Sequence, residues 1–199
     1  MDNYEQYYAH LNAISCLGRI YKRYFASQIL YYQAKKFGDN IAEIGSGIGS
    51  GILGAYPKHV IGFEINPLAV NFCKKKKLTV HLIDENKHYP AQEGEYDVCV
   101  LDNVLEHLAE PSFVLQECAR ITHKNAGLII AVPGDKGFLF DADHKKHYRE
   151  QELKNLSPEW QLLKTFSLPF IVKSELLSTL ISQYCLVAVY KKINLSIKR

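Results

Sequence analysis

The residues best placed to do chemistry in this chain form a glycine-rich turn. Gly45, Gly47 and Gly49 alternate with other residues directly after an apolar run, and Glu43 stands two residues before the first of them. Glycines in a turn allow positive φ angles and let backbone N–H groups approach a ligand closely. The dinucleotide fingerprint G-x-G-x-x-G/A is not met, because Ser50 takes its last position. An acid ahead of the loop could accept a hydrogen bond from a ligand amine but would repel a pyrophosphate, so the turn favours a positively charged ligand over NAD.

Further acids follow the next two apolar runs. Glu64 comes roughly 20 residues after the loop, where an acid binds ribose hydroxyls. Asp84 ends the third run and is placed to meet an adenine amino group. Ligands of open α/β sheets bind at the carboxyl ends of the strands. Three acids around a glycine loop at that edge predict a site for a nucleoside that bears positive charge.

Two histidines are candidates for proton transfer. His107 follows the fourth apolar run in the sequence Val-Leu-Glu-His, and His144 lies in a segment after the fifth run. An imidazole can act as a general base near neutral pH, but it can also simply anchor a turn. Residues 141–147 hold two aspartates and two histidines, which is a pattern that metal sites share, but we expect no metal there. Tyr148 is expected to seat the helix that follows it.

Short apolar runs alternate with helical patterns along the chain, which predicts an α/β doubly wound sheet with right-handed crossovers. The runs expected to form strands are residues 40–44, 59–63, 79–83, 96–101, 127–132, 161–166 and 185–191. The expected helices include residues 67–76, 112–122, 150–156 and 174–181. We see no linker and expect a single domain over residues 1–199, with residues 1–37 as a helical lid or cap and residues 38–199 as the core.

The glycine loop, the acids and the stretch at residues 95–108 together resemble the class I S-adenosylmethionine-dependent methyltransferases. The resemblance covers residues 40–132 well and is greatest to the small-molecule group that includes the ubiquinone-biosynthesis O-methyltransferases. It implies a Rossmann-like, seven-stranded, mostly parallel sheet with helices on both faces, whose last strand lies antiparallel beside the fifth. It also implies S-adenosyl-L-methionine as the cofactor.

By this resemblance the glycines wrap the amino-acid end of the cofactor, and Glu43 helps to hold that region. Glu64 binds the ribose hydroxyls, while Asp84 and Glu85 border the adenine. The cofactor-binding residues that the resemblance implies are Glu43, Gly45, Ser46, Gly47, Gly49, Glu64, Ile65, Asp84, Glu85, Asp102 and Asn103.

The expected activity is transfer of a methyl group to a small-molecule acceptor, at oxygen, by in-line displacement. The protein contributes mainly by positioning the reactants, and a base such as His107 or His144 is needed only if the acceptor keeps a proton. An S-adenosylmethionine-binding regulatory or partner protein without turnover is the alternative, although no element of the motif is broken. A nicotinamide-dependent oxidoreductase is opposed by the loop spacing. Residues 1–37, 133–148 and 167–183 are expected to select the acceptor, whose identity the sequence does not give.

The composition fits a soluble globular protein and excludes several other classes. The 199 residues hold 24 Lys+Arg and 21 Asp+Glu, a balance that argues against a nucleic-acid binder. No run approaches the roughly 18 apolar residues that a membrane span needs, so stable membrane insertion is not expected. The five scattered cysteines and the absence of a signal-like start favour a cytoplasmic protein, and the oligomeric state stays open. Many of the 13 tyrosines lie within residues 4–32, where Tyr21 and Tyr24 are candidates to touch the ligand.

Overall fold

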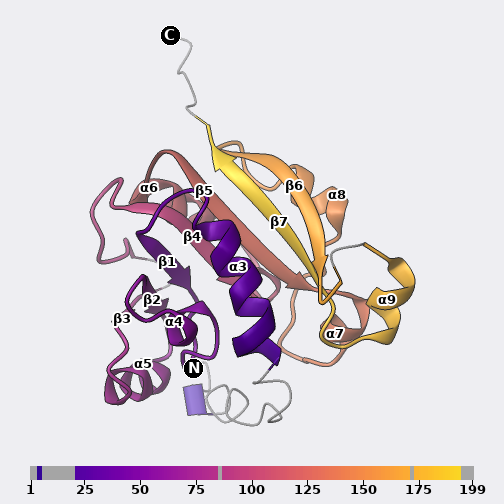
Figure 1. The fold of residues 1–199 in the computed structure, drawn as a ribbon, viewed down its shortest axis with the longest axis horizontal. Coiled ribbons are helices and arrows are strands. Elements are labelled where there is room, and N and C mark those ends of the chain that lie inside the picture. The colour runs from indigo at the N-terminus through magenta and orange to yellow at the C-terminus, as the bar shows by residue number, and fades with distance from the viewer. Residues whose placement is uncertain (1–3, 6–20, 85–86, 171–172, 194–199) are drawn as a thin grey trace.

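The computed structural model describes residues 4–5, 21–84, 87–170 and 173–193 (Figure 1). The strands are β1 (Ile41–Ile44), β2 (Val60–Glu64), β3 (Val80–Leu82), β4 (Tyr96–Asp102), β5 (Thr122–Pro133), β6 (Trp160–Leu168) and β7 (Cys185–Lys192). The helices are η1 (Lys22–Ala26), α3 (Ser27–Ala34), α4 (Ile52–Ala55), α5 (Pro67–Lys75), η2 (Leu105–His107), α6 (Ser112–Ile121), α7 (Asp135–Leu139), α8 (Glu150–Lys154) and α9 (Glu175–Leu180).

The seven strands form one sheet in the order β3-β2-β1-β4-β5-β7-β6. Strands β1 to β5 run parallel, and β7 is antiparallel to both β5 and β6. The predicted fold class is therefore confirmed, including the antiparallel last strand beside the fifth. Because β1, β2 and β4 are parallel neighbours, their carboxyl ends share one edge of the sheet.

Both faces of the sheet are buried, which explains the nearly continuous apolar runs of its central strands. Successive residues of a strand point to opposite faces, so Val98 and Val100 of β4 join one core cluster while Cys99 and Leu101 join the other. Helix α3 lies across one face (Figure 1) and adds Leu30 to the first cluster. Helix α6 covers the opposite face. This two-layer covering fixes the strands whose ends carry the site.

Local sequence explains where the flanking helices begin. Asn66 is the N-cap of α5, and its side chain accepts hydrogen bonds from the N–H groups of Leu68 and Ala69 at 2.9 and 3.4 Å. Pro67 occupies the first helical position, where a missing N–H has no effect. Pro111 stands at the N-cap of α6, directly before the first helical residue.

The expected strand and helix positions agree with the observed elements to within a few residues at most ends. The largest difference is in β5, which begins at Thr122 rather than at residue 127. The first part of β5 consists of polar residues, so the apolar pattern of the sequence does not reveal it. Its pairing with β4 is irregular around Tyr96 and Val98. Helix α8 ends at Lys154, two residues before the expected end.

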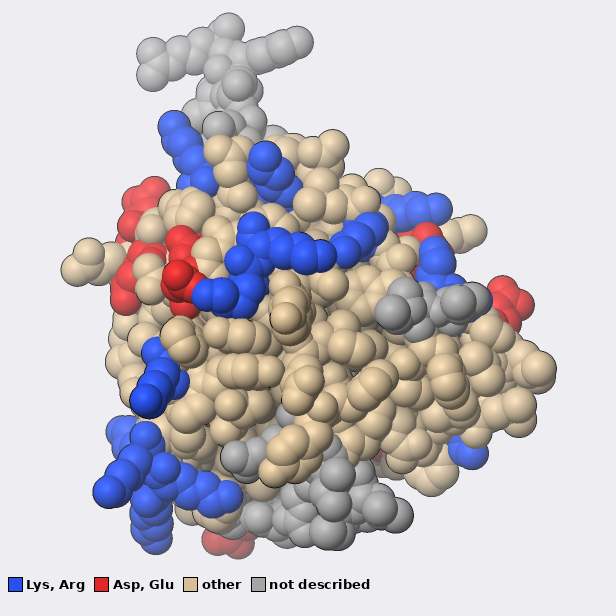
Figure 2. Space-filling view, in the orientation of Figure 1, with Lys and Arg blue, Asp and Glu red and all other residues tan. Residues whose placement is uncertain are grey.

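The end of helix α5 carries a run of positively charged residues that face the solvent. Residues 74–77 are four lysines at the end of α5, and all four are exposed. Figure 2 shows lysine side chains gathered at this corner of the molecule, apart from the largely uncharged surface over α3. Within the part of the chain that the structure describes, no helix has the length and apolar character needed to cross a membrane.

Candidate functional site

The glycine loop between β1 and α4 has the backbone conformation that its glycines suggest. Gly45, Gly47 and Gly49 have φ angles of +70°, +52° and +72°, a region that favours glycine. A Cβ atom on Gly45 would lie 2.5 Å from Cγ2 of Val104, just after β4. The loop therefore has no room for a side chain at Gly45 and folds tightly against the end of the sheet.

Glu43, on β1, is buried and faces the start of α4. Its carboxylate accepts hydrogen bonds from the N–H groups of Ile52 at 3.2 Å and Leu53 at 2.8 Å. Burial raises the pKa of Glu43 to about 7, although these hydrogen bonds act in the opposite direction. A Cβ on Gly51 would lie 2.1 Å from Oε1 of Glu43. Glu43 thus fixes the start of the helix that follows the loop. Its role in holding the amino-acid end of the cofactor stays a prediction.

Glu64, at the carboxyl end of β2, joins this strand to the glycine loop. Its Oε2 accepts the N–H of Gly47 at 2.6 Å, and its Oε1 accepts the N–H of Asn66 at 2.8 Å. The side chain is buried, and burial raises its pKa. A carboxylate has about four lone-pair sites, so Glu64 keeps the capacity to accept ligand hydroxyls, which is the role predicted for it.

The other residues predicted along this edge differ in their surroundings. Ser46 is buried and its hydroxyl has no hydrogen-bond partner among the described residues, while Ile65 is half-buried. Asp84 lies beyond β3, is half-buried, and pairs with Lys87 at 2.8 Å. Glu85 lies outside the described residues. The N-terminal part of the chain also reaches this edge of the sheet, because the carbonyl of Tyr4 accepts a hydrogen bond from Nδ2 of Asn66 at 2.9 Å.

Asp102, the last residue of β4, carries an ion pair that sequence reasoning missed. Its Oδ2 lies 3.1 Å from Nζ of Lys22, which belongs to η1. Burial disfavours the charge of Lys22, but Asp102, Glu43 and Cys185 together outweigh burial and raise the pKa of the lysine. Asn103 follows with a φ of +55° and donates from Nδ2 to Oδ1 of Asp102 at 3.0 Å. A cation from the N-terminal segment therefore lies beside residues predicted to bind the cofactor.

The two candidate catalytic histidines, far apart in the chain, come together in the structure. The ring centroids of His107 and His144 are 4.7 Å apart, and Nε2 of His144 lies 3.9 Å from Oε1 of Glu106. The carbonyl of Glu106 accepts hydrogen bonds from the N–H groups of Lys145 at 2.8 Å and Lys146 at 3.2 Å. These backbone contacts hold the segment of His144 against η2.

Glu106 is the second functional residue that sequence reasoning missed, although it stands next to His107. It is 0% exposed, and neither carboxylate oxygen has a hydrogen-bond partner among the described residues. Burial raises the pKa of Glu106 to about 8, and the negative charges of Asp102 and Asp141 add to this effect against Lys22. Burial and the nearby His144 lower the pKa of His107, so its imidazole is neutral and able to accept a proton.

A cavity of about 770 Å³ opens at the carboxyl end of β5, between α8 and α9. Its wall is largely polar: Oδ2 of Asp135 accepts from the hydroxyl of Ser178 at 2.7 Å, and Oδ1 lies 3.5 Å from Nε2 of His147. Tyr148 also lines it, and its buried hydroxyl has no hydrogen-bond partner among the described residues. Burial, aided by the charge of Glu106, raises the pKa of Tyr148 to about 12. Tyr148 therefore lines the cavity and also lies within the electrostatic influence of Glu106.

Comparison with known proteins agrees with this geometry. Residues 42–130 match the family model described as a methyltransferase domain. A chain of the complex between the Haloferax volcanii Trm112 methyltransferase activator and a methyltransferase has the same fold, with a TM-score of 0.71, 12% identity, and 98% of this chain and 99% of that chain covered. A SAM-dependent methyltransferase from Thermotoga maritima gives a TM-score of 0.68 at 15% identity and covers 96% of this chain and 100% of its own.

A third structure is that of a geranyl diphosphate C-methyltransferase from Streptomyces coelicolor with S-adenosyl-L-homocysteine. It has a TM-score of 0.65 and 10% identity, and the match covers 84% of this chain and 78% of that one. No curated protein sequence matches the chain. At such low identities the structural likeness shows the fold alone.

The family match gives residues 42–130 as a methyltransferase domain, and the fold is shared with S-adenosylmethionine-dependent methyltransferases, which supports S-adenosyl-L-methionine as the cofactor. The residues at the site fit that group: the loop glycines have positive φ angles that turn the backbone tightly at the strand ends, and buried Glu64 keeps lone-pair capacity beside them. The narrower likeness to ubiquinone-biosynthesis O-methyltransferases stays a prediction.

Proposed function

We propose that this protein methylates a small-molecule acceptor at an oxygen atom. The observation that carries the proposal is the cluster of Glu106, His107 and His144, in which Glu106 and His107 follow β4 and His144 joins them from the segment after α7. Val104, just beyond the end of β4, packs against Gly45 of the glycine loop. A hydroxyl acceptor must lose its proton, and a neutral imidazole at this place can receive it. When bound, S-adenosyl-L-methionine supplies a methyl group that is already activated by its sulfonium.

The chain's own residues supply position and a proton acceptor. The glycine loop and Glu64 hold the cofactor side of the site, while η1 and the segment of His144 enclose the acceptor side. Holding the reacting atoms near contact distance can supply several kcal/mol of the barrier, which is about the scale of a well-oriented intramolecular reaction. His107 or His144 takes the hydroxyl proton as the new bond to carbon forms.

The polar cavity supports a small, polar acceptor. Two of its walls come from residues 133–148 and 167–183, the segments expected to select the acceptor. Charges of both signs line it, among them Asp135, Arg149 and Lys173. This surface suits an acceptor with hydrogen-bonding or charged groups better than a purely hydrocarbon one.

Two experiments test the proposed function. Calorimetric titration should detect binding of S-adenosyl-L-methionine and no binding of NAD, and the reverse would contradict the proposal. A screen of cell extract with labelled methyl donor, with the product identified by mass spectrometry, should then give a methyl ether or ester. A product methylated at nitrogen or carbon would contradict the choice of oxygen.

The histidines are tested separately in the same assay. His107→Ala and His144→Ala should each lower kcat, by about 10²–10⁴-fold for the residue that acts as the base. His123→Ala is a suitable control, because His123 pairs with Asp97 near the start of β5, at the opposite end of the strands from this cluster. Turnover near that of the wild type in both variants would exclude histidine base catalysis.

A further inference from the structure

Glu106, His107 and His144 have the residue types and the spacing of a metal site. One potential ligand atom from each side chain lies within 4.8 Å of the other two. Atoms bound to one Zn²⁺ at about 2.0–2.2 Å are roughly 3–4 Å apart, and Nε2 of His144 already lies 3.9 Å from Oε1 of Glu106. Small rotations of the side chains would bring all three to a common ion.

The carboxylate of Glu106 is the first independent indication of a missing ligand. A buried polar group without a partner is rare in folded proteins, and a buried charge without one is more costly still. Neither oxygen of Glu106 has a hydrogen bond to another residue within the described part of the chain, and only the backbone N–H of Glu106 itself acts on the carboxylate as a donor. Besides His144, at 3.9 Å, the charges that act on Glu106 are those of Asp102, Asp141 and Lys22, and Lys22 is paired with Asp102. The surroundings of Glu106 therefore favour an added cation.

The orientation of His144 is the second indication. Its Nδ1 lies 2.8 Å from the carbonyl oxygen of Phe138. A carbonyl can only accept, so Nδ1 carries the hydrogen and the lone pair of Nε2 is left on the side of Glu106. Metal-binding histidines almost always donate their other ring N–H in this way. His107 is also held by a hydrogen bond with the backbone of Asp143.

We propose that Glu106, His107 and His144 bind one divalent transition-metal ion such as Zn²⁺. Two imidazoles and one carboxylate are a ligand set that suits Zn²⁺ and its neighbours in the first row, whereas Mg²⁺ prefers oxygen ligands only. The metal was not expected from the sequence, because residues 141–147 contribute only His144 and the other two ligands come from η2.

Three protein ligands leave a fourth position open, as in catalytic zinc sites. If the proposed function holds, the acceptor hydroxyl fills that position, and the ion lowers the pKa of the hydroxyl so that its proton leaves to water. An oxygen lone pair then forms the bond to the methyl carbon as the carbon–sulfur bond breaks and its electrons go to sulfur. The histidines in this case activate the acceptor through the metal rather than as free bases.

The test is a titration of the chelator-treated full chain with Zn²⁺ by calorimetry and with Co²⁺ by visible absorption. The wild type should bind one ion per chain, and Co²⁺ should give the absorption bands of a site with nitrogen ligands. Mg²⁺ should not compete. Glu106→Gln and His144→Ala should weaken Zn²⁺ binding at least about tenfold, whereas His147→Ala should not change it.

Glu106→Gln keeps the shape of the side chain, and circular dichroism of the metal-free variants checks that they fold. If His144→Ala does not fold, the wild type and Glu106→Gln decide the matter. The proposal is overturned if the wild type does not bind Zn²⁺, if Glu106→Gln binds it as tightly, or if His147→Ala loses it equally.

The same samples separate this proposal from the proposed function. S-adenosyl-L-methionine is titrated into the metal-free and the Zn²⁺-loaded protein. Loss of Zn²⁺ binding with intact cofactor binding overturns the metal site alone. Absence of cofactor binding with Zn²⁺ bound overturns the proposed function and supports the metal site.

Discussion

At the scale of single residues, four buried acids near the carboxyl edge of the sheet have different roles because their partners differ. Glu43 accepts backbone N–H groups of α4, and Glu64 accepts those of the glycine loop and of Asn66. Asp102 is paired with Lys22, whereas Glu106 has no hydrogen-bond partner among the described residues. The acids that accept backbone N–H groups hold the fold together, and the proposed metal site rests on Glu106, which accepts none from another described residue.

The raised pKa of Glu43 predicts a pH dependence of stability. The folded chain holds this proton up to about pH 7, but the unfolded chain loses it near 4.5. Between these values the folded state binds more protons, so the free energy of unfolding falls as the pH rises. In Glu43→Gln the side chain keeps its neighbours Lys22 and Asp102 but cannot ionise. The free energy of unfolding of this variant should therefore fall by about 2–3 kcal/mol less than that of the wild type over this pH range. Urea unfolding at pH 5, 6, 7 and 8 measures it.

Glu117→Gln is the matched control for this experiment. Although burial acts in the other direction, hydrogen bonds from Arg120 and Tyr89 lower the pKa of Glu117 to about 2. Its contribution is present above about pH 4.5 and is lost only as the pH falls toward 2. The slope between pH 5 and 8 should therefore stay that of the wild type. An unchanged slope in Glu43→Gln would contradict the first prediction.

The glycine loop predicts a second effect at this scale. Gly45 and Gly94 have similar φ angles, +70° and +72°, but only at Gly45 would a Cβ clash, whereas at Gly94 its nearest neighbour is 3.7 Å away. Gly45→Ala should therefore lose about 1–3 kcal/mol more stability than Gly94→Ala, because of overpacking against Val104. The substitution Gly45→Ala should also weaken the binding of S-adenosyl-L-methionine at least about tenfold, which is equivalent to about 1.4 kcal/mol. Equal losses in both variants, measured by urea unfolding and calorimetry, would refute a special role for the loop.

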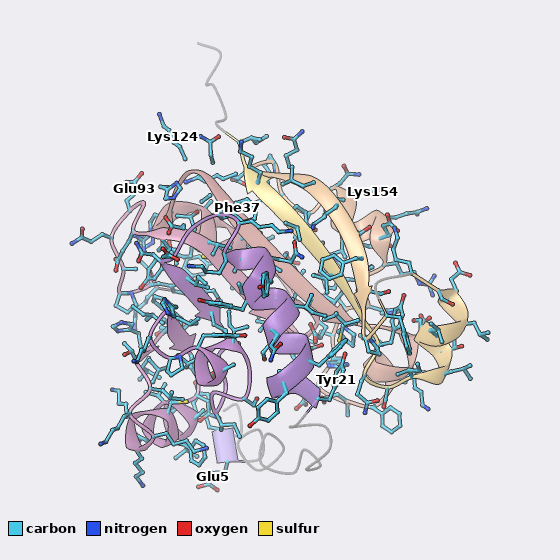
Figure 3. All side chains as sticks on the ribbon, in the orientation of Figure 1. Glu5, Tyr21, Phe37, Glu93, Lys124 and Lys154 are labelled. Atoms are coloured by element: carbon cyan, nitrogen blue, oxygen red, sulfur yellow. The ribbon has the colours of Figure 1, made fainter. Side chains whose placement is uncertain are left out.

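At the scale of elements, η1 and α3 bring aromatic side chains and a cation to the edge where the glycine loop lies. Tyr21 lies at the start of this helical segment (Figure 3), and its hydroxyl has no hydrogen-bond partner among the described residues. Burial raises its pKa, with Cys185 and Asp102 adding to the effect. Tyr24, in contrast, is 63% exposed. Of the two tyrosines expected near the ligand, Tyr21 is better placed; Tyr7 and Tyr8 lie outside the described residues.

Lys22 gives this segment a testable relation to the cofactor. Lys22→Met should lower the free energy of unfolding by about 1–3 kcal/mol, because Asp102 is left nearly buried without its cation. Saturating S-adenosyl-L-methionine should then raise the melting temperature of the variant more than that of the wild type. In this variant the positively charged cofactor does not have to displace the ammonium group of Lys22 from the carboxylate of Asp102.

Lys35→Met provides the control, because Lys35 pairs with Asp39 in an exposed i,i+4 pair on the same helix side of the sheet. It should alter neither stability nor the cofactor-induced shift by more than a small amount. A smaller cofactor-induced shift in Lys22→Met than in the wild type would mean that the lysine binds the cofactor and does not compete with it.

At the scale of the whole molecule, the sheet separates two core clusters, and α3 is packed into one of them. Leu30 of α3 and Leu128 of β5 are both 0% exposed and lie in different clusters. Because the same strands contribute to both clusters, we predict one cooperative unfolding unit that includes α3.

Leu30→Ala and Leu128→Ala should each lower the free energy of unfolding by about 2–5 kcal/mol. The single tryptophan, Trp160, is buried in the cluster of Leu128 and reports that side of the sheet by its fluorescence. Both variants should shift the fluorescence and the circular-dichroism transitions together. If Leu30→Ala leaves the Trp160 transition unchanged, α3 unfolds separately and the single unit is disproved.

The sequence by itself determined the sheet and the chemistry of its edge. Apolar runs bounded by polar residues predicted all seven strands, and alternating glycines after the first run predicted the loop, because both signals are local. The acids Glu64 and Asp102 could also be placed in advance, since they end strands whose order follows from the fold.

Only the tertiary structure decided which side chains meet at the site. His107 and His144 lie on separate segments, and the backbone hydrogen bonds from Lys145 and Lys146 to Glu106 bring them together. Lys22 reaches Asp102 because η1 and α3 fold back over the sheet. The sequence could not reveal the unpartnered carboxylate of Glu106, because burial and hydrogen bonding depend on contacts between distant segments, which chain spacing does not fix.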